Sequence, residues 1–239
     1  MADTTQYSFV RYEQKYFLTP QQQAALLECI APHIQHDVYG RYTICSLYYD
    51  TDDWRLIRAS LGKPVYKEKL RLRSYGRADR EHPVFMELKK KYRSIVYKRR
   101  LTLPYGRALD CLTGDCPWPE TQIGREIGYA MDFYPDLEPR VFLSYERDSW
   151  YAPESGLRIT FDDAIRFRTA DLTLDSDLWG TALLRPDQVL MELKAPGAIP
   201  LWMVRLLTEM GLYKTSFSKY GTAYQILLEQ EYKGGKRYA

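Results

Sequence analysis

The chain has 239 residues, 45% of them hydrophobic, which is enough to bury a sizeable core and argues against a disordered protein. The 34 Lys and Arg residues exceed the 31 Asp and Glu residues by only three, so overall charge does not indicate a nucleic-acid-binding protein. No run approaches the roughly 18 apolar residues of a membrane span, and the polar N-terminal segment has no signal-peptide pattern. The four cysteines show neither a CxxC pair nor zinc spacing, so we expect reduced thiols and a cytoplasmic protein.

The hydrophobic patterns predict an α+β chain in which strands predominate. Thr19 and Pro20 form a strong helix start, with Thr as the N-cap and Pro at the first helical position. The side chains predicted to face inward from this first helix are Ala24, Leu27, Ile30 and Ile34. Period-two alternation predicts strands over 9–18, 42–50, 65–76, 83–92, 94–101, 138–150, 157–168 and 188–194. The predicted helices are 20–33, a short one ending near 61, 106–113, 121–133, 199–210 and 217–229.

Three consecutive strands between Val65 and Leu101 are rich in cations. From Lys63 to Arg100 the chain has fourteen Lys and Arg residues against four acidic ones. Alternate side chains of a strand share a face, so each strand should project its charges from one side. The residues predicted to share such faces are Lys67, Lys69, Arg71 and Arg73 on the first strand, Phe85, Glu87, Lys89 and Lys91 on the second, and Lys98 and Arg100 on the third.

Like charges in line repel one another, so an anion or solvent must offset them. One interpretation is a solvated outer face, with Leu70, Leu72, Met86 and Leu88 turned into the core. The other is a cavity lined for a polyanion, which the recurrence on three strands favours. Closing about eight strands into a barrel would place alternate residues around an interior. We therefore predict an eight-stranded antiparallel barrel around a wet tunnel, with helices only at its edges and ends.

Common catalytic motifs are missing from the sequence. HExxH, GxSxG and GxxxxGK[ST] do not occur, and the three histidines are scattered. Arginines, lysines and a few carboxylates remain, which suits phosphoryl transfer, where positioning and charge neutralisation dominate and a carboxylate-bound divalent ion bridges phosphate oxygens. A Glu-x-Lys frame occurs on three predicted strands, and although a structural ion pair could explain any one, the recurrence favours a site. The three frames are Glu13-Lys15, Glu87-Lys89 and Glu192-Lys194.

Several segments occur in the order seen in VTC-domain polyphosphate polymerases, which the chain resembles from about residue 8 to 230. They are Arg11-Tyr-Glu-Gln-Lys-Tyr16, Ser46-Leu-Tyr-Tyr-Asp50, Lys69-Leu-Arg-Leu-Arg-Ser-Tyr-Gly76, Glu87-Leu-Lys89 with Lys98-Arg-Arg100, Ser144-Tyr-Glu-Arg147, Arg158-Ile-Thr-Phe-Asp162, Glu192-Leu-Lys194 and Ser218-Lys-Tyr220. The resemblance implies the eight-stranded fold of triphosphate tunnel metalloenzymes (CYTH-like superfamily). It also implies transfer of the terminal phosphate of ATP onto a polyphosphate chain with Mn²⁺ or Mg²⁺, by one catalytic domain spanning 1–239.

The resemblance also implies roles for individual residues. Those similar to the family's phosphate-binding residues are Lys15, Arg71, Arg73, Lys89, Lys98, Arg147, Arg158 and Lys219. Glu192 resembles the metal-bearing acid, and we expect Glu13 or Glu87 to assist it. Strand alternation adds Lys69, Arg100 and Lys194 to the phosphate-binding set. The side chains predicted to act in catalysis are Lys15, Arg71, Arg73, Arg147 and Glu192.

The sequence departs from the family pattern in two places. Arg11 stands where related CYTH phosphatases carry the first Glu of an ExExK motif, which speaks against a multi-glutamate metal cage. Ser216 stands where the polymerases often carry a basic residue, and Lys214 is the candidate substitute.

Three functions stay open at this point. They are a polyphosphate polymerase, a triphosphatase acting on inorganic triphosphate or nucleoside triphosphates, and a non-catalytic polyphosphate or inositol-phosphate sensor. The expected partners are ATP and polyphosphate, with no nucleic acid, and any translocation of product would need a membrane partner protein. The sequence does not indicate the oligomeric state.

Overall fold

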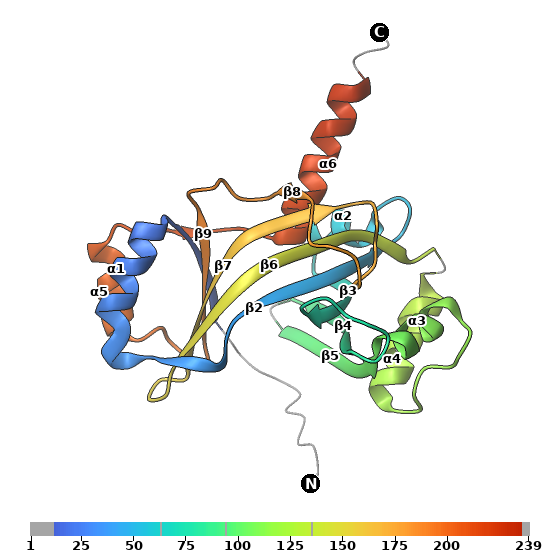
Figure 1. The fold of residues 1–239 in the computed structure, drawn as a ribbon, viewed down its shortest axis with the longest axis horizontal. Coiled ribbons are helices and arrows are strands. Elements are labelled where there is room, and N and C mark those ends of the chain that lie inside the picture. Colours follow the sequence, from blue (N-terminus) through green and yellow to red (C-terminus); the bar gives the residue numbers. More distant parts are fainter. Residues whose placement is uncertain (1–11, 63, 94, 135, 236–239) are drawn as a thin grey trace.

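A large antiparallel sheet organises the fold in the computed structural model, which describes residues 12–62, 64–93, 95–134 and 136–235 (Figure 1). Its strands are β1 (Tyr12–Leu18), β2 (Gln35–Asp50), β3 (Tyr66–Tyr75), β4 (Pro83–Tyr92), β5 (Ile95–Pro104), β6 (Glu138–Ala152), β7 (Leu157–Arg168), β8 (Thr181–Ala182), β9 (Val189–Ala195) and β10 (Lys214–Thr215). The helices are α1 (Pro20–Ile30), α2 (Arg55–Leu61), α3 (Tyr105–Thr113), α4 (Gln122–Phe133), α5 (Leu201–Glu209) and α6 (Lys219–Gly235), with a 3₁₀ turn, η1, at Ala31–His33. None of the helices in the described ranges is long and apolar enough to cross a membrane.

The strand order is β10-β1-β9-β7-β6-β2-β3-β4-β5, with β8 beside β7. All pairings are antiparallel, and the eight strands of seven residues or more are the eight predicted ones, so the α+β class and the tunnel-type sheet are confirmed. The two-residue strands β8 and β10 are too short to give an alternation signal. Within the described residues no ladder joins β5 to β1 or β10, so the sheet is open rather than closed as predicted. One edge strand, β10, has only two residues, which leaves little backbone to form a ladder with β5.

Helix α1 starts where the sequence predicts, at a capping box. The Gln22 backbone N–H donates to Thr19 Oγ1 (3.1 Å), and the Thr19 backbone N–H donates to Gln22 Oε1 (2.9 Å). The helix ends at Ile30, and η1 continues to His33. The predicted inward position of Ala24 is wrong, because the buried stripe follows an i, i+4 spacing that is two positions out of phase with it. Its buried members are Leu26, Ile30 and Ile34, while Leu27 is half-buried.

Strand β2 begins seven residues earlier than predicted, at Gln35. Its pairing with β6 shifts register between His36 and Arg41, and Gly40 takes a positive φ of 62° there, so alternation is interrupted and gave no strand signal. At the other end of β2, the buried Asp50 carboxylate accepts hydrogen bonds from the backbone N–H groups of Leu56 (2.8 Å) and Ile57 (2.9 Å). It also accepts from the Tyr220 hydroxyl (2.8 Å), so one carboxylate caps α2 and ties α6 to it.

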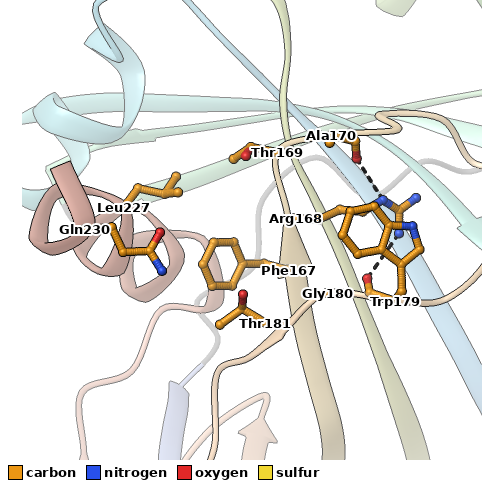
Figure 2. A pocket seen from close by; sticks show the side chains of 9 residues that line it. All are labelled: Phe167, Arg168, Thr169, Ala170, Trp179, Gly180, Thr181, Leu227 and Gln230. Carbon is orange, nitrogen blue, oxygen red and sulfur yellow. Dashed lines mark hydrogen bonds between the residues drawn. The ribbon is translucent and has the colours of Figure 1, made fainter. Parts of the chain in front are cut away.

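Arg168, at the end of β7, anchors the loop that leads to β8. Its Nη2 donates to the Asp171 carbonyl (2.9 Å), its Nη1 to the Trp179 carbonyl (3.3 Å) and its Nε to the Ala170 carbonyl (3.0 Å), and its guanidinium lies 3.6 Å from the centre of the Phe142 ring. The side chain borders a surface hollow of about 270 Å³ whose wall includes Trp179 (Figure 2). Because its donors are already engaged, Arg168 holds the loop.

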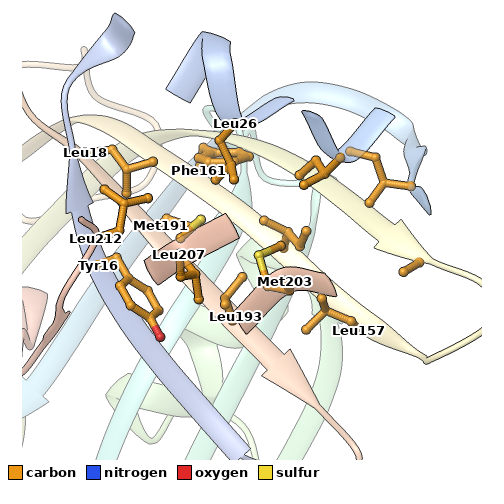
Figure 3. Packing of buried hydrophobic residues seen from close by; sticks show 14 of the residues in the cluster. Tyr16, Leu18, Leu26, Leu157, Phe161, Met191, Leu193, Met203, Leu207 and Leu212 are labelled. Carbon is orange, nitrogen blue, oxygen red and sulfur yellow. The ribbon is translucent and has the colours of Figure 1, made fainter. Parts of the chain in front are cut away.

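Two apolar clusters cover the face of the sheet that we call the outer face. In the first, α1 and α5 pack on β1, β7 and β9, and Leu26, Met203 and Phe161 lie at its centre (Figure 3). In the second, α3 and α4 pack on β2, β3 and β4, around Leu72 and Met86. The opposite, inner face is partly filled by a third cluster. There, residues of α2 and α6 pack against apolar side chains of β2, β6, β7 and β9. The remainder of the inner face carries charges.

Strand β7 contributes to both parts of the inner face because it changes parity at a bulge. Ala164 has a positive φ of 48°, and the pairing with β6 shifts register between Ser144 and Glu146. Before the bulge the even-numbered Asp162 faces inward. After it the odd-numbered Ile165 and Phe167 do so and belong to the inner apolar cluster. The bulge thus places a charged side chain and two apolar side chains on the same face of one strand.

Candidate functional site

The charged side chains of the inner face come from several strands and from the start of α6. The predicted face assignment holds on β3, where Leu70 and Leu72 are buried in the outer cluster and Arg71 and Arg73 lie opposite them. It holds likewise on β9, where Met191 and Leu193 pack outward and Glu192 and Lys194 pair with each other on the inner side. The predicted residues that this face gathers are Lys15, Lys69, Arg71, Arg73, Glu87, Lys89, Lys98, Arg100, Arg147, Glu192, Lys194 and Lys219.

Glu87 is the centre of one charge cluster. Its carboxylate, 1% exposed, lies 2.6 Å from Arg71 Nε, 2.6 Å from Arg100 Nη2 and 2.9 Å from Lys98 Nζ, with Arg73 Nε at 3.9 Å. Burial raises the pKa of the Glu87 carboxyl, but the surrounding cations outweigh it and hold the pKa well below its ordinary value. Glu87 is therefore ionised, and it compensates part of the charge of β3 and β5.

Glu192 is the centre of a second cluster on the other side of the inner face. Its carboxylate lies 2.8 Å from Lys194 Nζ, 3.3 Å from Lys15 Nζ, 3.6 Å from Lys219 Nζ and 3.9 Å from Arg147 Nη2. Burial again raises its pKa, and these four cations outweigh burial, so the pKa is lowered. Both oxygens of this carboxylate are therefore engaged by cations.

Asp162, a residue without a predicted role, organises two of those cations. It is fully buried and accepts from Arg147 Nε (2.6 Å), Arg147 Nη2 (2.7 Å) and Lys219 Nζ (2.5 Å). Burial lowers the pKa of Lys219, but the Asp162 charge outweighs it and raises that pKa. Arg147 meets Asp162 because the two are opposite each other in the β6–β7 register, whereas Lys219 comes from the start of α6. Strand parity reveals neither the register nor the approach of the helix.

Three lysines stand in one row across β3, β4 and β5. Lys69 is opposite Lys89, and Lys89 is opposite Lys98. In the described part of the chain neither Lys69 nor Lys89 forms an ion pair with a carboxylate, whereas Lys98 pairs with Glu87. Burial lowers the pKa of Lys69 and of Lys98 to about 8, and it lowers that of Lys89 as well. Like charges directly opposite one another destabilise a sheet. Lys89 and Lys98 are exposed, so solvent offsets part of the repulsion, and a bound anion would offset the rest.

The two sides of the inner face act on each other electrostatically. Burial is the largest influence on the lowered pKa of Lys89, and the charges of Glu13, Lys15 and Lys194 also act on it. Yet β4, which carries Lys89, is separated from β1 by β9, β7, β6, β2 and β3 in the sheet order. The sheet must therefore curve enough to bring its charged strands around a shared space. The segment just before α6 contacts this space, where Lys15 Nζ donates to the Phe217 carbonyl (2.8 Å).

Some predicted residues lie at the edge of this arrangement or outside the described residues. Arg158 has a side chain that is 55% exposed and pairs with Asp37 (3.2 Å), so it stands at the rim. Lys214 is exposed on β10. Arg11 falls outside the described residues.

Tyrosines that the sequence analysis missed also contribute. Tyr48 accepts a hydrogen bond from Arg71 Nη1 (2.9 Å) and stacks on Tyr220, with ring centres 4.4 Å apart. Burial raises its pKa, but the charges of Arg71, Arg73 and Lys69 outweigh burial and lower the pKa to about 8. The Tyr145 ring lies 4.5 Å from Lys219 Nζ. The signal available in the sequence was the parity of Tyr48 within Ser46-Leu-Tyr-Tyr-Asp50.

The three acids predicted to bear metal do not form one set. Lys15 Nζ bridges Glu13 Oε1 (3.4 Å) and Glu192 Oε1 (3.3 Å), whereas Glu87 belongs to the other cluster. Within the described ranges no three His, Cys, Asp or Glu side chains gather as a metal cage. Mg²⁺ in phosphate sites typically uses one or two carboxylates together with phosphate oxygens and water. Glu192 with Glu13 fits that smaller requirement.

Comparison with solved structures shows the class of fold. The chain is similar to a candidate adenylate cyclase from Bacillus halodurans, with a TM-score of 0.54, 14% identity, and coverage of 88% of this chain and 95% of that one. It is also similar to a candidate adenylyl cyclase from Hippeastrum, described as having a dominant triphosphatase activity, with a TM-score of 0.52, 16% identity, and coverage of 90% and 93%. At these identities the similarity shows the fold alone, which agrees with the tunnel-type fold expected from the sequence.

The sequence then shows the family. The VTC domain matches residues 10–228, and the chain belongs to the VTC domain family, which confirms the resemblance seen in its motifs. A comparison with curated proteins gives no match.

Proposed function

We propose that this protein is a metal-dependent polyphosphate polymerase that transfers the terminal phosphate of ATP onto a polyphosphate chain. The observation that carries the proposal is the row Lys69, Lys89 and Lys98, three cations in register on a shared face with too few carboxylates to neutralise them. A linear chain of phosphates supplies closely spaced negative charges along such a row. The membership of the VTC domain family supports the same substrate class.

In this proposal the arginines position and stabilise the transferred phosphoryl group. Glu87 holds Arg71 and Asp162 holds Arg147 through charge-assisted bonds of 2.6–2.7 Å, so their guanidinium groups are pre-oriented. The charge that develops on the phosphoryl oxygens would meet fixed cations and require little reorganisation. Glu192, with Glu13, would hold the divalent ion, which when bound would neutralise negative charge on the phosphate.

The alternative is hydrolysis, in which water replaces the phosphate acceptor. The triphosphatase activity described for the Hippeastrum protein is the reason to consider hydrolysis. Water must lose a proton to a base, yet Glu87, Asp162 and Glu192 are ion-paired carboxylates with lowered pKa values, which makes them weak bases. A phosphate acceptor is already an anion and needs no base. This difference favours the polymerase.

The test is incubation of the purified protein with ATP and Mn²⁺, followed by gel separation of the products. Synthesis predicts chains that lengthen with time and ADP released in step with them. Free phosphate without chains would establish the hydrolase instead. Tight tripolyphosphate binding without turnover of ATP or tripolyphosphate, with either Mn²⁺ or Mg²⁺, would leave the third possibility, a binding module. That residues 1–239 act as one catalytic domain is a further part of the proposal, and any translocation of the product would need a membrane partner protein.

The affinity for tripolyphosphate should fall with rising pH. Lys69 and Lys98 have pKa values lowered to about 8, so both are charged near pH 7 and lose their protons in the free protein above pH 8. Binding above that pH must first restore the protons, which lowers affinity by up to about tenfold per pH unit for each linked lysine. Metal-free calorimetry from about pH 7 to pH 9.5 measures the slope, and buffers of different ionisation enthalpy measure the proton uptake.

The control is the double variant Lys69→Arg with Lys98→Arg. Arginine keeps its charge over this range, and comparison with the variant cancels the titration of tripolyphosphate itself. The variant should show the flatter profile. Identical profiles for the two proteins would show that neither lysine titrates on binding.

A further inference from the structure

Thr160 stands on the inner face of β7 with a hydroxyl that lacks a partner. The residue is 6% exposed, and its Oγ1 is a buried side-chain atom for which the described residues provide no hydrogen bond. It alternates with Ile159 and Phe161, which pack in the outer cluster, so it shares the face of Asp162. A valine would fill the same space without an unmet hydrogen bond. The unpartnered hydroxyl therefore lowers the stability of the ligand-free protein.

The neighbour of Thr160 in register on β9 is Glu192. Directly opposed residues on antiparallel strands have Cβ atoms about 5 Å apart, within reach of a hydroxyl and a longer carboxylate side chain. In the ligand-free protein Lys194 and Lys15 occupy the Glu192 carboxylate, at 2.8 and 3.3 Å. Phosphate oxygens would compete for both lysines, and Glu192 would then keep only its two more distant partners, Lys219 at 3.6 Å and Arg147 at 3.9 Å.

We propose that Thr160 is a positioning residue that donates a hydrogen bond to Glu192 when phosphate draws the lysines away. The bond would fix the orientation of the carboxylate and leave its second oxygen free for the divalent ion. The inference rests on the proposed function, because it assumes that phosphate and a divalent ion meet at Glu192. It explains why a polar side chain occupies a buried position beside the acid.

The experiment compares Thr160→Val with Thr160→Ser. Mn²⁺ affinity is measured in the presence of saturating tripolyphosphate, by electron paramagnetic resonance of free Mn²⁺. We expect Thr160→Val to weaken Mn²⁺ binding about tenfold or more, the range found when a partner of a metal ligand is removed, and Thr160→Ser to remain close to the wild type. Tripolyphosphate affinity without metal should fall slightly in Thr160→Val, because the proposed bond forms only in the phosphate-bound protein, and should stay close to the wild type in Thr160→Ser. The melting temperature of ligand-free Thr160→Val should be equal to that of the wild type or higher.

Several outcomes would overturn the inference. Wild-type Mn²⁺ affinity in Thr160→Val would do so, as would equal losses in the Val and Ser variants, which would indicate a role for shape alone. If Thr160→Val does not fold, Thr160→Ala replaces it and is compared with Thr160→Ser in the same way. Thr181→Val, an exposed threonine on β8, is the matched control and should change none of these quantities.

The same data separate this inference from the proposed function. A wild-type protein that binds no Mn²⁺ with tripolyphosphate would overturn both. Chain synthesis by the wild type, together with a Thr160→Val variant that binds Mn²⁺ normally, would overturn only the role of Thr160. Hydrolysis in place of synthesis would overturn only the polymerase.

Discussion

Replacing Glu192 with Gln is expected to lower ATP turnover by about 10²- to 10³-fold, the range for losing one preorganised electrostatic group. Gln keeps the size of the side chain but cannot hold a divalent ion by charge. The cations around position 192 would also lose their compensating carboxylate, so tripolyphosphate should bind without metal at least as tightly as to the wild type. Steady-state turnover with Mn²⁺ and metal-free calorimetry measure the two effects.

The matched control is Glu13→Gln. Glu13 is the second carboxylate proposed to hold the ion, but its side chain is 41% exposed. Water can therefore replace it as a ligand, and its loss should reduce turnover less than the loss of Glu192. Wild-type turnover in Glu192→Gln at saturating Mn²⁺ would show that another group carries the metal. A loss of turnover accompanied by an equal loss of tripolyphosphate binding would instead indicate that the variant has disturbed the cluster as a whole.

Strand parity predicted which side chains share a face, and for most of the site this was sufficient. Leu72 and Arg73 are neighbours in sequence, yet the first packs under α3 and α4 and the second lies 3.9 Å from Glu87, as alternation requires. Parity works here because each basic strand alternates without interruption from β3 to β5. Once one side chain of a strand is assigned to a face of the sheet, alternation assigns every other side chain of that strand.

Parity could not predict which charges meet, because that depends on strand register and curvature. Glu87 pairs with Arg71 and Arg100 only because β3 and β5 flank β4 in the observed register. The bulge at Ala164 also escaped prediction, since an alanine with positive φ leaves no pattern in the sequence. The sequence analysis expected Glu13 or Glu87 to assist Glu192 at one metal ion. Register and curvature instead place Glu87 and Glu192 in separate clusters.

The two clusters suggest how the ligand-free protein tolerates its charged interior. Buried cations are costly unless they are paired, and Glu87, Asp162 and Glu192 each engage at least two of them. A bound phosphate chain would exchange these intramolecular partners for its own oxygens. Of the three acids, Asp162 is the most buried, so its loss should be the hardest to compensate.

Replacing Asp162 with Ala is therefore expected to lower stability by about 3–5 kcal/mol, the usual effect of breaking a buried ion pair. The change would leave Arg147 and Lys219, with side chains 12% and 10% exposed, without the carboxylate that holds both. For a chain of this length that corresponds to a fall in melting temperature of order 10 °C. Differential scanning calorimetry measures it directly.

The neighbouring residue provides the control. Asp163 pairs with Arg41 at 2.5 Å, but the two side chains are 25% and 50% exposed, so Asp163→Ala should cost no more than about 1 kcal/mol. Tripolyphosphate should raise the melting temperature of Asp162→Ala by more than that of the wild type, because its oxygens can replace the lost carboxylate beside Arg147 and Lys219. Equal stabilisation of the two proteins by tripolyphosphate would mean that the anion does not reach these cations.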